Sequence, residues 1–183
     1  MNLPPPTKEQ IKSHGMCFTP DSLVNEMLDK LPPEVFTDKN KTFLDNSAGR
    51  GAFLYQVMKR KIMSLQGKMI LAQAHKQALK TIYGVELDSV NAEECRQRLL
   101  NGSQSKELRN IINNNIICAD ALDWKHKGWK SVGFYWDKDF QPPQKEVKVK
   151  ETISNAPIKL ASPVRYNDFL NDLEEQIAHG ETW

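Results

Sequence analysis

The chain has 183 residues, of which 39% are apolar and 26% charged, a composition typical of a globular protein with a buried core. Its 25 basic and 23 acidic side chains give a net charge of +2, which neither requires nor excludes a polyanionic partner. The three cysteines form no CxxC pair and no Cys/His metal-binding pattern, which predicts free thiols, no metal and a cytoplasmic protein. The start of the chain is unlike a signal peptide, and no apolar run reaches the roughly 20 residues of a membrane span.

Residues 1–16 are polar and contain three consecutive prolines, which predicts an extended arm before a single domain at residues 17–183. The domain opens with the segment FTPDSLVNEMLDKLPP, which predicts a helix capped by Thr19 or Asp21 and ended by the final two prolines. Apolar side chains recur in this segment at four-residue spacing: Leu23, Met27 and Leu31.

Short apolar runs and amphipathic stretches alternate along the middle of the chain. The runs KTFLDN, TIYGVEL and NIICADAL predict buried strands. Helices are predicted from Ala52 to about Gln66, over MILAQAHKQALK, and over DSVNAEECRQRLL with Asp88 or Ser89 as its cap. This order predicts an α/β fold in which helices cover both faces of a parallel sheet and the crossovers are right-handed.

After Asp123 the pattern is less regular. The segments SVGFYWD and KEVKVKETIS predict further strands, and YNDFLNDLEEQIAHG predicts a closing helix. The apolar stripe of that helix consists of Phe169, Leu170, Leu173 and Ile177.

Acidic residues mark the ends of the three predicted strands. The first strand runs into the loop DNSAGRG, which begins at Asp45 and in which Gly49 and Gly51 let a ligand approach the main chain closely. Glu86 ends the second strand and Asp120 follows the third. The loop has neither the third glycine of the dinucleotide fingerprint nor the Gly-Lys-Ser/Thr of a phosphate loop.

These acids favour a nucleoside ligand that carries positive charge and no phosphate. An acid at the first strand end repels a pyrophosphate and attracts an ammonium group, and an acid at the second is placed to accept two ribose hydroxyls. S-adenosylmethionine (SAM) fits this description. Taken singly, Asp45 can instead cap the next helix and Asp120 can lie in a turn, so only the combination is specific.

The segments FTPDSLVNEMLDKLP, LDNSAGRGAFL, IYGVELDSVNAEECRQRLL and NIICADAL together resemble the amino-terminal half of SAM-dependent DNA adenine methyltransferases of the restriction-modification and phage types. The resemblance covers residues 16–123 and implies a class I, Rossmann-like methyltransferase fold, short or incomplete at its C-terminal end, with SAM as cofactor and DNA as partner. The cofactor contacts that it implies are Phe18, Thr19 and Pro20 beside the methionine part, Asp45, Ala48, Gly49 and Gly51 in the loop, Glu86 on the ribose, Leu87 against the adenine ring, Asp120 on the adenine amino group, and Ala121 nearby.

The family's catalytic motif, a short polar residue followed by Pro-Pro and an aromatic residue, is not intact in this chain. In that motif the polar side chain and the first proline carbonyl accept hydrogen bonds from the target amino group, and the aromatic ring stacks on the flipped base. Two partial matches are Gln141-Pro142-Pro143-Gln144 and Asn155-Ala156-Pro157-Ile158, and each is also typical of an ordinary loop or turn. Asn155, Pro157, Gln141 and Pro142 are therefore the weak catalytic candidates.

Two functions follow from these observations. The first is methyl transfer to the exocyclic amino group of adenine in DNA, and the alternative is a non-catalytic SAM-binding module or a truncated subunit. Only about 60 residues follow Asp123, which argues against base-specific reading of DNA by this chain alone and favours either a phage or mobile-element enzyme or a subunit that needs a partner chain. The basic clusters KRK (59–61) and KHKGWK (125–130) and four nearby aromatic residues can contact nucleic acid, but a solvated helix face and a packed core are the stronger interpretations.

Overall fold

The computed structural model describes residues 19–122, 168–171, 173 and 175. The predicted arm, the strands predicted at SVGFYWD and KEVKVKETIS, the cluster KHKGWK and both partial catalytic motifs lie outside the described residues. In the described part, no helix is both long and apolar enough to cross a membrane.

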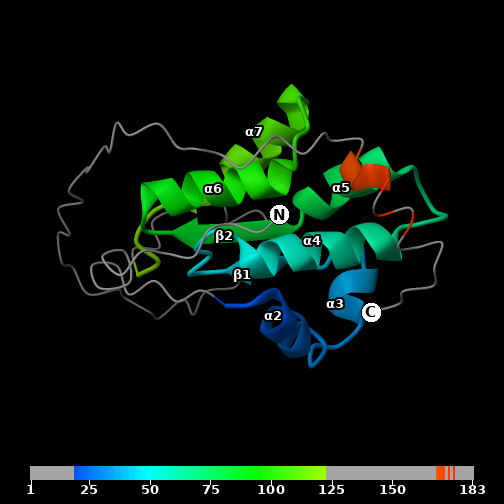
Figure 1. Cartoon of the computed structure of the whole chain (residues 1–183), viewed down its shortest axis with the longest axis horizontal. Helices are drawn as coiled ribbons and strands as arrows, with labels where there is room; N and C mark the ends of the chain where they lie inside the picture. The colour runs from blue at the N-terminus through cyan, green and yellow to red at the C-terminus, as the bar shows by residue number, and fades with distance from the viewer. Residues whose placement is uncertain (1–18, 123–167, 172, 174, 176–183) are drawn as a thin grey trace.

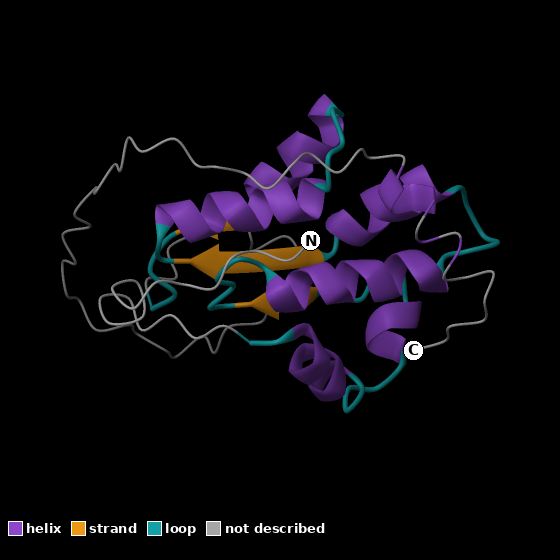
Figure 2. Ribbon diagram, viewed as in Figure 1, coloured by secondary structure: helices purple, strands orange, loops and turns teal. Residues whose placement is uncertain are grey.

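Three parallel strands form a sheet in the order β1-β2-β3, namely β1 (Phe43–Asp45), β2 (Ile82–Glu86) and β3 (Ile116–Cys118). Successive side chains of a strand point to opposite faces, so the buried residues of β2 supply two clusters. Ile82 and Ile116 join the main core with the helices, whereas Tyr83 and Val85 belong to a smaller cluster. The predicted parallel α/β arrangement, with helices flanking the sheet, is confirmed (Figure 2).

The helices of residues 19–122 are α2 (Asp21–Leu28), α3 (Glu34–Thr37), α4 (Ala52–Ser64), α5 (Leu71–Leu79), α6 (Ser89–Leu100) and α7 (Lys106–Asn115). Helix α4 contacts β1, β2 and α6, and α6 contacts β2 and β3. Figure 1 shows α4 and α6 lying along the sheet, with α2 and α3 beside α4. Gly84 makes this close packing possible, because a Cβ there would lie 2.8 Å from Leu54 Cδ1 of α4.

The helix predicted from Ala52 is confirmed, and so is the Asp88 cap of α6, whose Oδ1 accepts the Asn91 N–H at 2.8 Å. The cap predicted for α2 is wrong. Pro20 occupies the cap position with extended backbone, and it has no polar side chain that can accept a hydrogen bond. The four-residue repeat of α2 is its exposed side, since Val24 and Leu28 are the buried residues of this helix.

Two cations of α4 are buried, so the interpretation of KRK as a solvated helix face is wrong for Arg60 and Lys61, which are 5% and 1% exposed. Lys61 Nζ donates to the Lys41 carbonyl at 2.7 Å, and burial lowers the pKa of Lys61 to about 8. Arg60 lies over the Phe36 ring and donates to the Asn25 carbonyl. Helices α2 and α3 cover this part of α4, so these two cations make contacts within the protein and are not placed to bind a nucleic acid.

The described residues of the predicted closing helix are helical and contact the core. Phe169 and Leu173 are buried, Leu170 is half-buried, and Ile177 lies outside the described residues. The Phe169 ring meets the buried His75 ring edge-on, with 5.8 Å between the ring centroids. This contact places residues 168–171 against α5 (Figure 1).

Candidate functional site

The carboxyl ends of the three strands lie at one edge of the sheet. Asp45 is level with Gly84 of β2, and Glu86 is level with Cys118 of β3. The Ala119 N–H donates to the Glu86 carbonyl at 2.9 Å, so the chain leaves β3 beside the end of β2 and places Asp120 next. The structure thus brings the ends of β1, β2 and β3 together, as the sequence predicts.

The loop after β1 folds back onto the end of β2. The Ser47 N–H donates to Asp45 Oδ1 at 3.0 Å, and the buried Ala48 donates its N–H to the Val85 carbonyl at 2.9 Å. The Gly49 N–H then donates to Glu86 Oε2 at 2.7 Å. The N-cap of α4 is Gly51, so the alternative interpretation of Asp45 as a helix cap is wrong.

The two loop glycines share a left-handed backbone but differ in their surroundings. Their φ angles are +53° at Gly49 and +78° at Gly51. A Cβ at Gly51 would lie 2.7 Å from Cys95 Sγ, so this glycine lets the loop pack against α6. A Cβ at Gly49 would meet no atom within 4 Å, so the surface beside Gly49 is open.

The Glu86 carboxylate is held by two backbone donors. Its Oε1 accepts the Asp88 N–H at 3.0 Å and its Oε2 accepts the Gly49 N–H at 2.7 Å. Each carboxylate oxygen can accept a second hydrogen bond, so the group remains able to bind hydroxyl groups. The neighbouring Leu87 is 60% exposed and gives this edge an open apolar surface.

The electrostatics of the edge favour a cation. Burial raises the pKa of the Asp45 carboxyl, against the lowering effect of the Ser47 N–H, and the charge of Glu86 raises it further. Two acids therefore share a partly desolvated position, where a positive ligand group would offset their repulsion. Among the described residues, no group of three or more His, Cys, Asp and Glu side chains could hold a metal ion.

Asp120 takes part in a turn, as the alternative interpretation allows. Its Oδ1 accepts the Leu122 N–H at 2.8 Å, which leaves its other carboxylate oxygen for a further partner. Leu122 is 73% exposed and was not singled out from the sequence, although it follows Asp120 and Ala121 directly.

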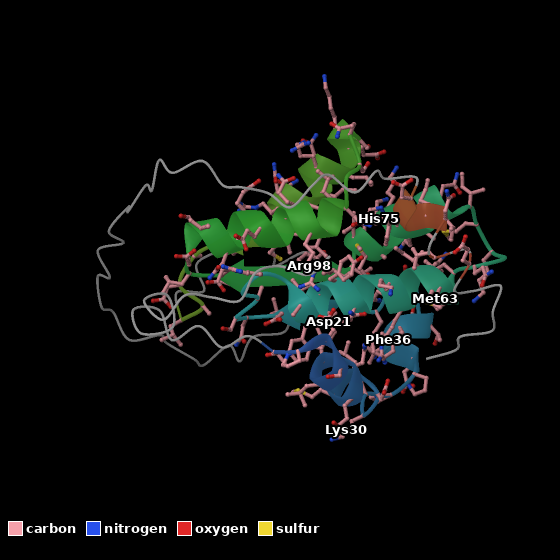
Figure 3. The ribbon with its side chains drawn as sticks, viewed as in Figure 1. Asp21, Lys30, Phe36, Met63, His75 and Arg98 are labelled. Carbon is pink, nitrogen blue, oxygen red and sulfur yellow. The ribbon has the colours of Figure 1, made fainter. Side chains whose placement is uncertain are left out.

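Thr19 and Pro20 precede α2, and α2 is tied to α6 by Arg98, whose Nη2 lies 3.4 Å from Asp21 Oδ1 (Figure 3). Phe18 and the four catalytic candidates, Asn155, Pro157, Gln141 and Pro142, lie outside the described residues. The site as described is therefore the strand edge with its glycine loop.

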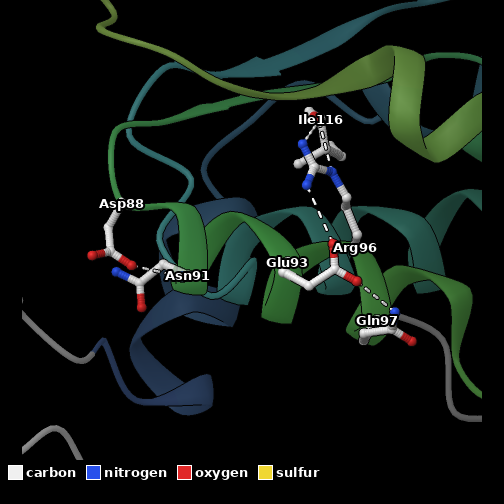
Figure 4. Close-up of polar contacts among 6 residues, drawn as sticks. All are labelled: Asp88, Asn91, Glu93, Arg96, Gln97 and Ile116. Atoms are coloured by element: carbon white, nitrogen blue, oxygen red, sulfur yellow. Dashed lines mark hydrogen bonds and ion pairs between the residues drawn. The ribbon is translucent and has the colours of Figure 1, made fainter. Parts of the chain in front are cut away.

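Helix α6 lies beside this edge, and hydrogen bonds attach it to β3. Asp88 caps its amino end, and the Arg96 guanidinium donates to the Ile116 carbonyl of β3 through Nε at 3.0 Å and Nη2 at 2.9 Å (Figure 4). A further contact to α6, which the sequence did not predict, is the ion pair between Arg50 of the loop and Glu94. The position of Arg50 between two glycines was its only signal in the sequence.

Residues 4–157 match the model of a family described as N-6 DNA methylase. The match spans most of the chain and includes the glycine loop and all three strand ends. Searches among curated proteins and among solved structures gave no significant match.

Proposed function

Because the chain belongs to the N-6 DNA methylase family, whose enzymes use SAM and act on DNA, we propose that it transfers a methyl group from SAM to the exocyclic amino group of adenine in DNA. One observation carries the proposal beyond family membership. The glycine loop is hydrogen-bonded through Gly49 to the carboxylate of Glu86, at an edge that Asp45 shares. This places an open backbone surface and two acids at the same position.

The residues of this edge fit SAM in chemistry and in access. The carboxylates of Asp45 and Glu86 suit its ammonium group and its ribose hydroxyls, and the exposed Leu87 offers an apolar surface for the adenine ring. The open surface at Gly49 leaves room for the ligand. We extend the proposed contacts to the other residues that the family resemblance implies: Phe18, Thr19, Pro20, Ala48, Gly51, Asp120 and Ala121.

When bound, SAM would supply a methyl group on a sulfonium sulfur, which leaves as a neutral thioether. The chain then has to orient the acceptor nitrogen in line with that methyl group, and positioning of this kind supplies most of the rate. Gln141-Pro142 and Asn155-Ala156-Pro157 remain the proposed positions for accepting hydrogen bonds from the target amino group.

A second function is favoured by one observation. The sequence contains no short polar residue followed by Pro-Pro and an aromatic residue. In this family, that motif binds the target base. A non-catalytic SAM-binding module, or a subunit whose target recognition lies on another chain, would need the cofactor edge and not that motif.

Transfer of labelled methyl from SAM to mixed-sequence DNA distinguishes the two functions. The proposed enzyme incorporates label at the adenine amino group, alone or with a cellular partner. Binding of SAM without transfer under either condition would favour the second function. If transfer occurs, Asn155→Ala and Gln141→Ala identify the target pocket, since only the variant of the residue that contacts the base should abolish it.

Gly49→Ala tests the assignment of the loop, and Gly67→Ala is its matched control. Both glycines have left-handed backbone and open space where a Cβ would lie, but Gly67 lies in the turn after α4. Both variants should lose about 1–2 kcal/mol of folding free energy from backbone strain. Only Gly49→Ala should weaken SAM binding at least tenfold, about 1.4 kcal/mol. Equal SAM affinities in the two variants would argue against this loop.

A further inference from the structure

Arg50 lies between the two loop glycines, and its side chain is turned away from the open surface onto α6. The side chain is 9% exposed, and its Nε lies 2.8 Å from Oε2 of Glu94, whose side chain is 15% exposed. The same Nε lies 3.5 Å from Asn91 Oδ1. We propose that Arg50 and Glu94 are a positioning pair that fixes the glycine loop in the conformation that binds SAM, an inference that rests on the proposed function.

The burial of Arg50 argues against more obvious roles for a cation in this loop. An arginine that bound DNA phosphates or a ligand carboxylate would present its guanidinium at the surface. Here the guanidinium faces a carboxylate of the protein, and almost all of its surface is covered. Because a buried charge is tolerated only with a partner, Glu94 fixes where the Arg50 side chain can lie.

The contacts to α6 come from one side of the helix. Asn91, Glu94 and Cys95 are three and four residues apart, so they share a face. Asn91 and Glu94 meet the Arg50 side chain, and Cys95 meets the main chain at Gly51. The loop is therefore joined to α6 at residues 50 and 51.

A separate set of contacts joins the loop to β2. The Ala48 N–H donates to the Val85 carbonyl, and the Gly49 N–H donates to Glu86. The peptide between residues 49 and 50 thus lies between two anchors, β2 on one side and α6 on the other. With glycine on both sides, the backbone at Arg50 would be flexible without these contacts. The ion pair therefore restricts the backbone conformation of this stretch.

Release of the α6 anchor should loosen the loop and leave the rest of the fold intact. Glu94→Gln removes the charge and keeps the shape of the side chain. In the protein without ligand, we expect amide hydrogen exchange at residues 49–51 to become at least tenfold faster. We also expect SAM binding measured by calorimetry to weaken about tenfold, which is about 1.4 kcal/mol.

Two further variants make the test specific to the pair. The charge swap Arg50→Glu with Glu94→Arg should restore both the exchange rates and the SAM affinity to within a few-fold of wild type. Glu93→Gln is the matched control, because Glu93 precedes Glu94 on α6 and pairs with Arg96 at 3.3 Å, away from the loop. This control should change neither readout.

Unchanged exchange and unchanged SAM affinity in a folded Glu94→Gln protein would overturn the inference. So would a charge swap that folds and binds SAM no better than the single variant. A wild-type protein that binds no SAM would overturn the proposed function, and the exchange rates would then still decide whether the pair holds the loop.

Discussion

Alanine at Gly51 should destabilise the fold more than alanine at Gly49, the other left-handed glycine of the loop. Gly51 has a φ of +78°, and a Cβ there would lie 2.7 Å from Cys95 Sγ and 3.4 Å from its Cα and Cβ. A non-glycine residue in left-handed backbone costs about 1–2 kcal/mol, and an inserted methyl group in a packed position costs about 1–3 kcal/mol. The expected loss for Gly51→Ala is therefore about 2–5 kcal/mol.

Urea denaturation with Gly49→Ala as the comparison measures this loss. Gly49→Ala carries the backbone strain without the steric clash, so it should lose only about 1–2 kcal/mol. The clash also predicts a rescue. Cys95 is fully buried and its burial raises the pKa of its thiol to about 12, so the thiol is neutral and acts by packing. Cys95→Ala removes Sγ and should recover much of the loss of Gly51→Ala.

The double-mutant cycle of Gly51 and Cys95 should show a coupling free energy of about 1 kcal/mol or more. Equal losses for Gly51→Ala and Gly49→Ala, or purely additive effects of Gly51→Ala and Cys95→Ala, would refute the packing of the loop on α6.

Three further predictions concern titratable groups whose pKa is shifted by burial. Since the pKa of Asp45 is raised, its carboxylate opposes folding above that pKa; Asp45→Asn should raise the melting temperature at pH 7 and weaken SAM binding, and a lower melting temperature would contradict this. Burial lowers the pKa of His75 from 6.5 to about 4, so the unfolding free energy should fall by up to about 3 kcal/mol as pH falls through this window, and His75→Gln should abolish that fall in a pH series of denaturation curves. The pKa of Lys61 is lowered from 10.5 to about 8, so the free energy of unfolding should rise with pH between these values. If another group is responsible, the difference in unfolding free energy between wild type and Lys61→Met will not change with pH.

The sequence was sufficient for the sheet and for the acids at its edge, because both depend on local patterns. Short apolar runs with turn formers identified β1 and β2, and parallel strands connected by helices must end at one edge. Asp45 and Glu86 were therefore predictable as neighbours. The Asp88 cap of α6 was predictable for the same reason, since a cap acts on residues three positions away.

Contacts between distant segments could not be predicted in this way. Lys61 looks like part of a solvated cluster until Lys41 and the covering helices are placed around it. The side of α2 that is buried depends on α4 and not on the four-residue repeat. The partners of Arg50 on α6 are about 40 residues away, so its inward orientation has no local signature.

Helices α3 and α7 were also missed. Helix α3 has only four residues, too few for a recognisable period. Helix α7 begins after Ser105, whose hydroxyl accepts the Leu108 N–H, and its buried residues Leu108 and Ile112 are four apart in a mostly polar segment. That spacing was present in the sequence, but few apolar residues carry it.

The central claim is that Glu86 holds both the glycine loop and the ribose of SAM at the carboxyl edge of the sheet. Calorimetric titration of SAM into wild-type protein, Glu86→Gln and the control Glu93→Gln tests this claim most directly. We predict that wild type and Glu93→Gln bind with equal affinity, and that Glu86→Gln binds at least tenfold more weakly, a difference of about 1.4 kcal/mol or more. Equal affinities in all three proteins, or no binding of SAM by wild type, would contradict it.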